Sequence, residues 1–359
     1  MVKRQNVSKR RPISVSGAKP SGAHANARVI VDRFRLDHPI SRSVNGEVWQ
    51  AFDLKSGATV AVKLIQSRFM AGENFGVRLR REGEVLASLH HPAVVKVIEC
   101  GEASDRELFL AMEFAKGATL ESIIKRDGPM KPNKLALVIS QVAGALDNAH
   151  AIGIVHRDVN PANILVHTEA DGKTTVKLLD FGLAKLLEPD EAQQMNVTGA
   201  AMIIGRAEFM APEQAGGDPV SAATDVYALG LTMYFALTGR PPFSESSEIE
   251  TLLAQLKNPV PPFSQSNPKV SLPVVLEETV KKALSKKEND RYHSAGEFAA
   301  QFCQAAGVPA PTSRVEVKSI ELKAGVRRHT KNNGKFVRVA ASIAAAVLVA
   351  AVLYFQLQS

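Results

Sequence analysis

Cysteine is scarce in this chain, and its first stretch has no long apolar run. The 359 residues include two cysteines, Cys100 and Cys303, whose separation fits no metal-ligand spacing. We therefore expect neither a structural disulfide nor a small disulfide-stapled fold, which suits a reducing cytosol. Residues 1–28 are rich in Ser, Gly, Pro, Lys and Arg and lack the apolar run that a signal peptide needs. We expect this stretch to be disordered.

Acidic residues are few in two stretches, so the net charge of +8 is unevenly distributed. Residues 1–32 hold seven Lys and Arg against one Asp, and residues 306–338 hold eight against two acidic residues. The body between them is therefore net acidic. The basic character belongs to two arms, which indicates surfaces that touch anionic lipid or nucleic acid, or simply two solvated tails.

Strand-like patterns fill the first third of the chain, and helical periodicity fills most of the rest. Alternating or β-branched runs predict strands at residues 33–53 (around a turn), 60–62, 94–99 and 107–114. From residue 117 onward apolar residues recur at helical spacing, with a long helix predicted at residues 135–151. A short hairpin turning at Asp171-Gly172 interrupts them, between strands at 164–166 and 176–179.

The chemistry is concentrated in residues 154–165, IVHRDVNPANIL, and in residues 179–182, LDFG. Asp158 is a carboxylate in a tight loop, Asn163 follows five residues later, and Asp180 is a second carboxylate before Phe-Gly. These are the groups that phosphoryl transfer from a metal-bound nucleotide requires. The pattern resembles the bacterial serine/threonine protein kinases of the eukaryotic-like (Hanks) type, over roughly residues 33–304.

The resemblance implies an α+β fold of two lobes, with a small β-rich N-lobe and a large helical C-lobe. The predicted parts of the chain are a disordered basic arm (1–28), a kinase domain (29–305, with the lobes dividing near residue 115), a basic juxtamembrane linker (306–338) and a transmembrane helix (339–357).

The membrane prediction rests on residues 339–355, which are apolar apart from Ser342. As a helix they span roughly 25 Å, and with residues 356–357 they approach the hydrocarbon thickness of about 30 Å. The basic residues just before them predict a single-pass protein of the inner membrane with the kinase domain in the cytosol. The alternative is a terminal helix docked on the kinase.

The resemblance also implies catalytic roles. Asp158 accepts or orients the proton of the attacking hydroxyl, and Asn163 and Asp180 hold Mg²⁺. Lys63 bridges the α and β phosphates of ATP and pairs with Glu82 on the following helix, with Glu84 as the competing candidate.

The nucleotide site implied by the resemblance has an apolar roof of Val48 and Ala61 and a floor of Leu165. Met112 is the gatekeeper, and the backbone of residues 113–115 is the hinge that hydrogen-bonds adenine. A set of this composition also suits plain core. The residues assigned to the nucleotide are Ser41, Ser43, Gly46, Val48, Ala61, Lys63, Met112, Glu113, Ala115 and Leu165.

Structural roles follow from the same resemblance, which implies that residues 221–238 form the central buried helix. His156, Phe181 and Leu86 are expected to stack between the lobes. Asp225 is expected to tie down the backbone of the catalytic loop, and Glu213 and Arg291 to form a buried ion pair under the activation segment.

The sequence departs from the family at three places. Ser41 and Ser43 replace two glycines of the phosphate loop, of which Gly46 is kept; serine accepts extended backbone but approaches phosphate less closely. Asn160 replaces a lysine that contacts the γ-phosphate, and Arg206 replaces a threonine that hydrogen-bonds the catalytic Asp.

We hypothesise that the Arg206 guanidinium restores the charge lost at Asn160, beside the γ-phosphate. Loss of one such positioned group typically lowers the rate about 10²- to 10³-fold. The alternative is that Arg206 pairs with Asp158 and blocks it.

Regulation is predicted at Thr198, the only Ser or Thr between residues 183 and 211. The resemblance implies that Arg157 contacts a phosphate on the activation segment, so we hypothesise that Thr198 is the activating phosphosite and pairs with Arg157 once modified. Small residues at four-residue spacing in 340–350 would let two membrane helices pack closely, which predicts weak homodimerisation and phosphorylation in trans.

The main hypothesis is thus an active membrane-tethered Ser/Thr kinase that uses ATP and Mg²⁺ on protein substrates. The alternative is a weak or inert pseudokinase scaffold that binds nucleotide and partner proteins. We expect no nucleic-acid partner; salt-dependent DNA retention lost on deleting residues 1–28 would revive one.

Overall fold

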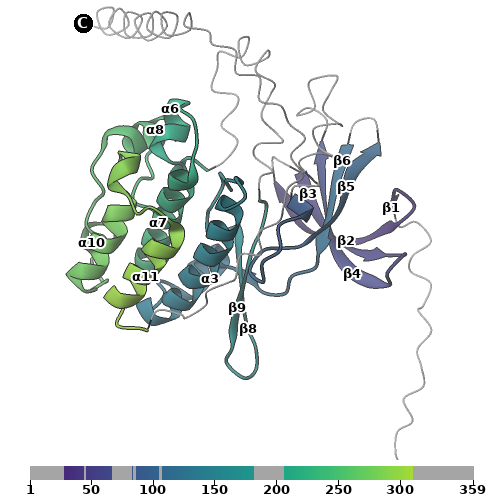
Figure 1. Ribbon diagram of the computed structural model, residues 1–359, viewed down its shortest axis with the longest axis horizontal. Coiled ribbons are helices and arrows are strands. Elements are labelled where there is room, and N and C mark those ends of the chain that lie inside the picture. The colour runs from purple at the N-terminus through teal and green to yellow at the C-terminus, as the bar shows by residue number, and fades with distance from the viewer. Residues whose placement is uncertain are drawn as a thin grey trace, which may run out of the picture. The chain divides into compact units, whose positions relative to one another are not determined.

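The computed structural model describes residues 28–43, 46–66, 83, 86–104, 107–181 and 206–309, with the side chains of Ser43 and Gln66 excepted. A six-stranded antiparallel sheet comes first in the sequence, and helices follow (Figure 1). The two-lobed fold implied by the resemblance is therefore confirmed.

The first sheet has the strand order β1-β2-β3-β4-β6-β5. Its strands are β1 Val29–Ile30, β2 Phe34–Ser43, β3 Gly46–Asp53, β4 Ala58–Gln66, β5 Val97–Ser104 and β6 Glu107–Glu113. Residues that alternate along β4 separate two apolar clusters, because successive side chains of a strand point to opposite faces. Ala61 and Ile65 belong to one cluster, and Val60, Val62 and Leu64 to the other.

One predicted strand begins at a later residue than expected. Residues 94–99 were expected as a strand, but β5 begins at Val97 and runs on to Ser104. The residues before it cross to the second sheet instead: Val94 forms an isolated parallel bridge with Leu178, and Val95 N donates to Leu178 O at 3.1 Å. The apolar run is therefore shared between two sheets.

A second, three-stranded sheet joins the hinge to the catalytic loop. It has the order β7-β8-β9, with β7 at Ala118–Thr119, β8 at Ile164–Thr168 and β9 at Thr174–Leu178. The β8–β9 hairpin turns where the Asp171-Gly172 pair predicted it, with Gly172 at φ 87°. This hairpin places Asn163 just before β8 and Asp180 just after β9.

Helices make up the second lobe (Figure 1). They are α2 Leu120–Asp127, α3 Pro132–His150, α6 Pro212–Gly216, α7 Ala222–Thr238, α8 Glu248–Lys257, α9 Phe263–Ser266, α10 Val274–Ala283 and α11 Ala295–Ala305, with 3₁₀ turns η3 Ala207–Phe209 and η4 Glu288–Asp290.

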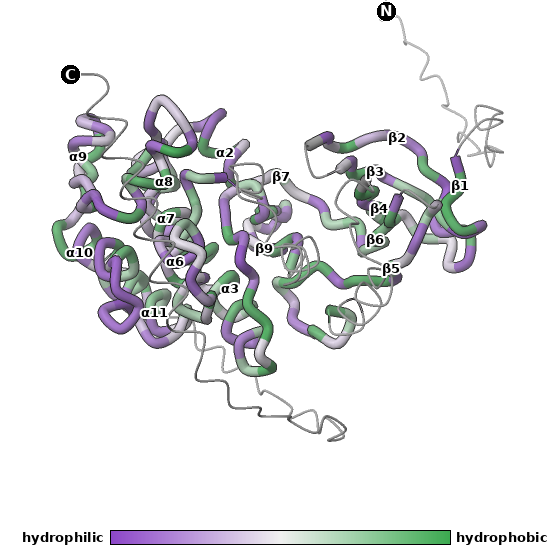
Figure 2. The backbone as a smooth tube through the Cα atoms, turned by 90° about the horizontal axis from the view of Figure 1, so that it is seen from above, coloured by the Kyte–Doolittle hydropathy of each residue, from purple (hydrophilic) through white to green (hydrophobic). Residues whose placement is uncertain are grey.

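The helix α7 is the centre of this lobe. Its residues from 224 to 238 are buried all round, and α3, α10 and α11 contact it. A helix that is apolar on every side belongs in a core, whereas the outer helix α10 has both polar and apolar stretches (Figure 2). Ser221 caps α7 by accepting from Ala223 N at 3.1 Å. This cap defines the start of the helix and so places Asp225 in its first turn.

Helix predictions were confirmed apart from their ends. The helix expected at residues 135–151 is α3, which begins at Pro132 because proline suits the first turn of a helix. The helix expected at 221–238 is α7.

Several predictions fall outside the described residues: Glu82, Glu84, Thr198, the linker at 306–338 beyond residue 309, and the helix at 339–357. Among the helices that the structure does describe, none is both long and apolar enough to cross a membrane.

Candidate active site

The main chain of the catalytic loop is hydrogen-bonded to a carboxylate of α7. Asp225 is fully buried and accepts from His156 N at 2.8 Å and from Arg157 N at 2.9 Å. Arg157 has φ 68°, a conformation that costs a non-glycine residue free energy and persists where neighbours fix it. The predicted role of Asp225 is confirmed.

A second fastener of the loop was missed by sequence reasoning. Gln214 Nε2, in α6, donates to Arg157 O at 2.8 Å, while Gln214 Oε1 accepts from Ala211 N at 3.2 Å. This side chain therefore connects the end of the activation segment to the residue before Asp158. A glutamine after Ala-Pro-Glu gives no signal of its own, because its partner is 57 residues away.

The Asp158 carboxylate lies between two amides. Asn160 Nδ2 donates to Asp158 Oδ1 at 2.8 Å, and Asn163 Nδ2 donates to Asp158 Oδ2 at 2.9 Å. Both amides also donate to the main-chain oxygen of Asp158, at 3.2 and 2.9 Å. Each carboxylate oxygen thus has its own donor, which fixes the plane of the group.

Burial raises the pKa of the Asp158 carboxyl, and the nearby Asp180 carboxylate adds to this, while His156 and the amide of Asn160 oppose it. A carboxylate whose proton affinity is raised in this way is better suited to accept a proton from a hydroxyl.

The Asp180 side chain, which follows β9, contacts the N-lobe sheet. Asp180 Oδ2 accepts from Lys63 Nζ of β4 at 2.7 Å, and the Lys63 side chain is 11% exposed. The pairing of Lys63 with Glu82 lies outside the described residues, so it stays a prediction.

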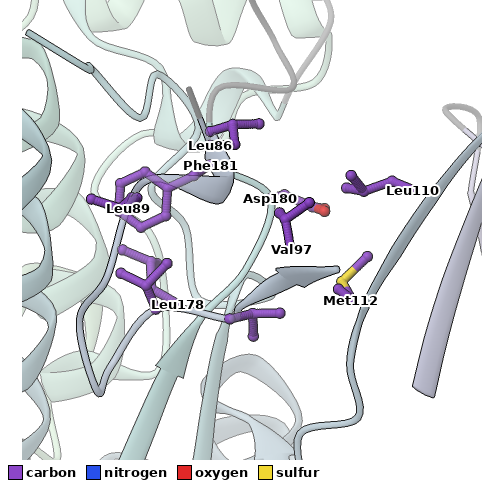
Figure 3. Close-up of a pocket in the computed structure, with 10 residues that line it drawn as sticks. Leu86, Leu89, Val97, Leu110, Met112, Leu178, Asp180 and Phe181 are labelled. Atoms are coloured by element: carbon purple, nitrogen blue, oxygen red, sulfur yellow. The ribbon is translucent and has the colours of Figure 1, made fainter. Parts of the chain in front are cut away.

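Phe181 and His156 pack between the lobes as expected, with ring centroids 4.4 Å apart. Leu86 belongs to the same core cluster. Phe181 and Leu86 border a small cavity of about 20 Å³ that Met112 and Asp180 also line (Figure 3). His156 Nε2 lies 2.8 Å from Leu179 O, which ties this stack to the backbone before Asp180.

Several of the residues predicted to line the nucleotide site lie close together. Val48, Ala61, Met112 and Ala115 share one apolar cluster, so the expected roof, gatekeeper and hinge are brought together. Leu165, the expected floor, is half-buried on β8 and pairs with Thr119 of β7.

The hinge carries an ion pair that sequence reasoning missed. The Glu113 carboxylate accepts from Lys177 of β9 and from Lys96 N. It therefore connects the last strand of the N-lobe sheet to the hairpin that delivers Asp180.

The phosphate loop is described on both sides of residues 44–45. Ser41 is exposed and pairs with Val48, and Ser43 pairs with Gly46, so both serines lie in extended backbone as expected. Gly46 has φ 133°, and a Cβ built there would lie 2.0 Å from Leu64 O. Gly46, the glycine of the phosphate loop that the sequence keeps, thus lies where the sheet leaves no room for a side chain.

Arg206 is paired away from the catalytic carboxylate. Its guanidinium is 2.7 Å from Glu121 Oε1 in the first turn of α2, and Lys125 Nζ is 2.8 Å from the same oxygen. Burial opposes ionisation of Glu121, but these two cations hold its pKa below the usual value. Glu121 N donates to Pro161 O at 2.9 Å, so the pair lies beside the catalytic loop. A role of Arg206 at the γ-phosphate stays a prediction.

The donor set fits a magnesium ion. Asp180 supplies a carboxylate, and Asn163 supplies an amide oxygen that faces away from Asp158, because its nitrogen donates to that residue. Carboxylate and amide oxygens are the ligands that hard cations such as Mg²⁺ prefer.

Comparison with known proteins agrees with this geometry. The protein kinase domain model matches residues 34–305. Serine/threonine-protein kinase PknB of Mycobacterium leprae is 36% identical over 289 residues, which is 79% of this chain and 45% of the relative. Serine/threonine-protein kinase pkn3 of Myxococcus xanthus is 32% identical, over 77% of this chain and 50% of the relative. The chain thus spans about half the length of these curated relatives.

A solved structure is similar over the same region. The crystal structure of the Mycobacterium tuberculosis PknI kinase domain superposes with a TM-score of 0.61 at 26% identity, covering 78% of this chain and 99% of that one. Since the family model covers most of the sequence, this chain belongs to the protein kinase domain family and resembles its bacterial serine/threonine members.

Proposed function

We propose that this chain is a serine/threonine protein kinase that transfers the γ-phosphate of ATP to protein hydroxyls. The observation that carries the proposal is the arrangement around Asp158: a carboxylate held by an amide on each oxygen, with the Lys63–Asp180 pair linking the two lobes. Relatives named as serine/threonine-protein kinases support the same activity.

In the transfer step, Asp158 accepts the proton of a Ser or Thr hydroxyl while the hydroxyl oxygen forms a bond to the γ-phosphorus. The bond from that phosphorus to the leaving oxygen breaks, and ADP departs with the electron pair. Lys63 would hold the α and β phosphates, and Asn163 and Asp180 would hold Mg²⁺. The ion, when bound, neutralises the negative charge on the phosphate oxygens.

The test is transfer of labelled phosphate from ATP·Mg²⁺ by the full chain to itself and to a generic basic protein substrate. Mass spectrometry of the products identifies the modified side chains. We expect phosphoserine or phosphothreonine. Nucleotide binding without any label would instead favour a pseudokinase scaffold.

That scaffold is the second candidate, and it is supported by Ser41 and Ser43 in the phosphate loop and by the pairing of Arg206 with Glu121. Changing Arg206 to Thr separates the possibilities for this residue. A lower transfer rate supports a role for its charge at the γ-phosphate, an unchanged rate refutes that role, and a higher rate indicates that Arg206 inhibits.

We further propose that Thr198 is the activating phosphosite, since it is the only hydroxyl residue in 183–211. A Thr198→Ala variant is expected to lose both the label at that position and most of the activity toward other substrates. Undiminished activity would contradict the proposal.

Attachment to the inner membrane through residues 339–357 is proposed from the apolar sequence and its basic flank. The full chain is expected in the membrane fraction and resistant to salt extraction, and a variant ending at residue 338 in the soluble fraction. A soluble full chain would contradict this.

Weak homodimerisation is proposed from the small residues at 340–350. Energy transfer between labelled copies of the 339–357 segment in bilayers is expected to fall when Ala341 and Ala345 are changed to Leu. Monomeric behaviour of the unchanged segment would contradict this.

A further inference from the structure

The catalytic loop contains an amide where its relatives' pattern has a cation, and the structure shows what that amide does. Asn160 is 3% exposed, so its side chain is confined to the partners that surround it. Those partners are Asp158 on one end of the amide and Ala162 N on the other, the latter at 2.9 Å from Asn160 Oδ1.

The orientation of this amide is fixed by chemistry. A main-chain N–H only donates, so the end of Asn160 that faces Ala162 has to be the oxygen. The nitrogen then faces Asp158 and donates to its Oδ1 at 2.8 Å. The turn is closed a second time by Asn163 N, which donates to Asn160 O at 3.0 Å.

The loop thus holds Asp158 symmetrically. Asn160 contacts one carboxylate oxygen and Asn163 the other, and both contact the main-chain oxygen of Asp158. Rotation of the carboxylate about its terminal bond would break both side-chain hydrogen bonds at once. Its remaining lone pairs therefore keep a fixed direction.

Few side chains could replace Asn160 here. Lysine carries only donors and cannot accept from Ala162 N. Aspartate can accept from Ala162 N but cannot donate to Asp158, and it would place two negative charges side by side. Alanine does neither. Asparagine satisfies both neighbours without adding charge.

We infer that Asn160 is a positioning residue, which fixes the Asp158 carboxylate toward the incoming hydroxyl and does not stand in for a cation at the γ-phosphate. The inference rests on the proposed kinase function. It agrees with the pairing of Arg206 to Glu121, which lies outside this hydrogen-bond set.

Three variants of the full chain test the inference. Asn160→Ala is expected to lower kcat about 10²-fold through misplacement of the base, with KM for ATP changed little. The acid limb of its kcat profile shifts to higher pH, because loss of a donor to an ionised carboxylate raises the pKa of that group. Asn160→Asp shifts the limb further in the same direction.

Asn160→Lys gives opposite results under the two explanations. If Asn160 positions Asp158, restoring the family's lysine lowers kcat, because Ala162 N loses its acceptor. If the missing cation limits the rate, the same change raises kcat. A faster Asn160→Lys variant, or an Asn160→Ala variant with an unchanged kcat and pH profile, overturns the inference.

The matched control is Asn267, whose amide has the same two-ended pattern far from the loop. Asn267 Nδ2 donates to Thr238 O at 2.8 Å, and its Oδ1 accepts from Lys269 N at 3.1 Å. Asn267→Ala is expected to lower thermal stability while leaving the pH profile of kcat unchanged.

A carboxyl titration keeps the inference separate from the proposed function. Carbon-detected NMR of ¹³C-labelled aspartate gives the pKa of Asp158 in the full chain and in Asn160→Ala, whether or not phosphate is transferred. A higher pKa in the variant supports positioning by Asn160, and equal values contradict it. Absence of transfer in the unchanged chain refutes the kinase function alone.

Discussion

Lys63 Nζ lies 2.7 Å from Asp180 Oδ2, in a position that is largely closed to solvent. Electrostatic groups in such places act more strongly than in water, because the surroundings screen them less. The pair joins residues that are 117 positions apart, and so it couples the N-lobe sheet to the segment that follows β9.

Replacing Lys63 by Met keeps the length of the side chain and removes the charge. Transfer is expected to fall about 10²- to 10³-fold, because the phosphates lose a positioned cation. The measurement is the initial rate of labelled phosphate transfer. Lys281→Met is the control, since Lys281 also forms a 2.7 Å pair, with Glu277 on α10. Equal rates in the two variants would contradict the role of Lys63.

At the scale of elements, the short helix α6 determines how the activation segment ends against the catalytic loop. Gln214 contacts Ala211 N and Arg157 O, and Arg157 is held in a strained conformation. The element thus supports the residue immediately before Asp158.

Gln214→Leu is expected to lower kcat about tenfold or more, because loss of Gln214 leaves Arg157 O without this donor and loosens the loop. Gln141→Leu is a suitable comparison, since Gln141 also holds two main-chain groups, Thr174 O and Val176 N, at the β9 hairpin. Both variants should lose stability, but only Gln214→Leu should lose specific activity. A similar loss in both would refute a role in positioning.

The pairing of β3 with β4 requires a glycine at the start of β3. Gly46 has φ 133° and no room for a Cβ against Leu64 O, whereas Gly57, at φ 72°, has open space around its Cβ position. Gly57→Ala is expected to cost about 1–2 kcal/mol of unfolding free energy for its left-handed backbone. Gly46→Ala is expected to cost clearly more, because the strand must also move. Denaturant unfolding measures both, and equal costs would contradict the account.

At the scale of the whole molecule, the buried pair of Glu213 and Arg291 fastens α6 to the segment before α11. Arg291 donates twice to Glu213 at 2.8 Å, as the resemblance implied. Burial opposes the charge on Glu213, but Arg291 outweighs it and holds the pKa of the carboxyl below its ordinary value of 4.5.

The sign of the pH dependence follows from that direction. A carboxyl with a lower pKa in the folded state stabilises fully above about pH 4.5 and loses this contribution as the pH falls through the folded-state pKa. Glu213→Gln is expected to lower the Tm at pH 7, at a cost of up to about 3–5 kcal/mol, and to flatten the fall of Tm below pH 4.5.

Asp127→Asn serves as the control for this pH series. Asp127 pairs with Arg126 on the surface, where both side chains are more than half exposed. Solvent screens such an exposed pair, so it adds little to stability and the Tm of Asp127→Asn should follow that of the unchanged chain. Parallel Tm curves for Glu213→Gln and the unchanged chain would contradict the account.

The parts of the molecule that the sequence could predict are those whose signals are local. The strand and helix order, the Asp171-Gly172 turn and the motif around Asp158 are each written within a few residues. The start of β5 was missed because residues 94–95 pair with another sheet, which an apolar run does not reveal.

Contacts between distant positions could not be predicted. Arg206 and Glu121 lie 85 positions apart, and neither carries a motif that names the other. Asn160 could be recognised as a departure, but its acceptor role depends on the direction of Ala162 N, which backbone geometry sets. The sequence motifs therefore located the site, whereas the side-chain contacts in the structure show how each residue is held in it.

The most direct test of the central claim compares Asp158→Asn with Asp147→Asn in the full chain. Asp147 is a structural carboxylate that accepts from Ala295 N and Gly296 N at 3.0 Å, away from the catalytic loop. The measurements are labelled phosphate transfer and nucleotide affinity. The account predicts that Asp158→Asn lowers transfer at least about 10²-fold with affinity retained, while Asp147→Asn transfers normally. Equal transfer by the Asp158→Asn variant and the unchanged chain would contradict it.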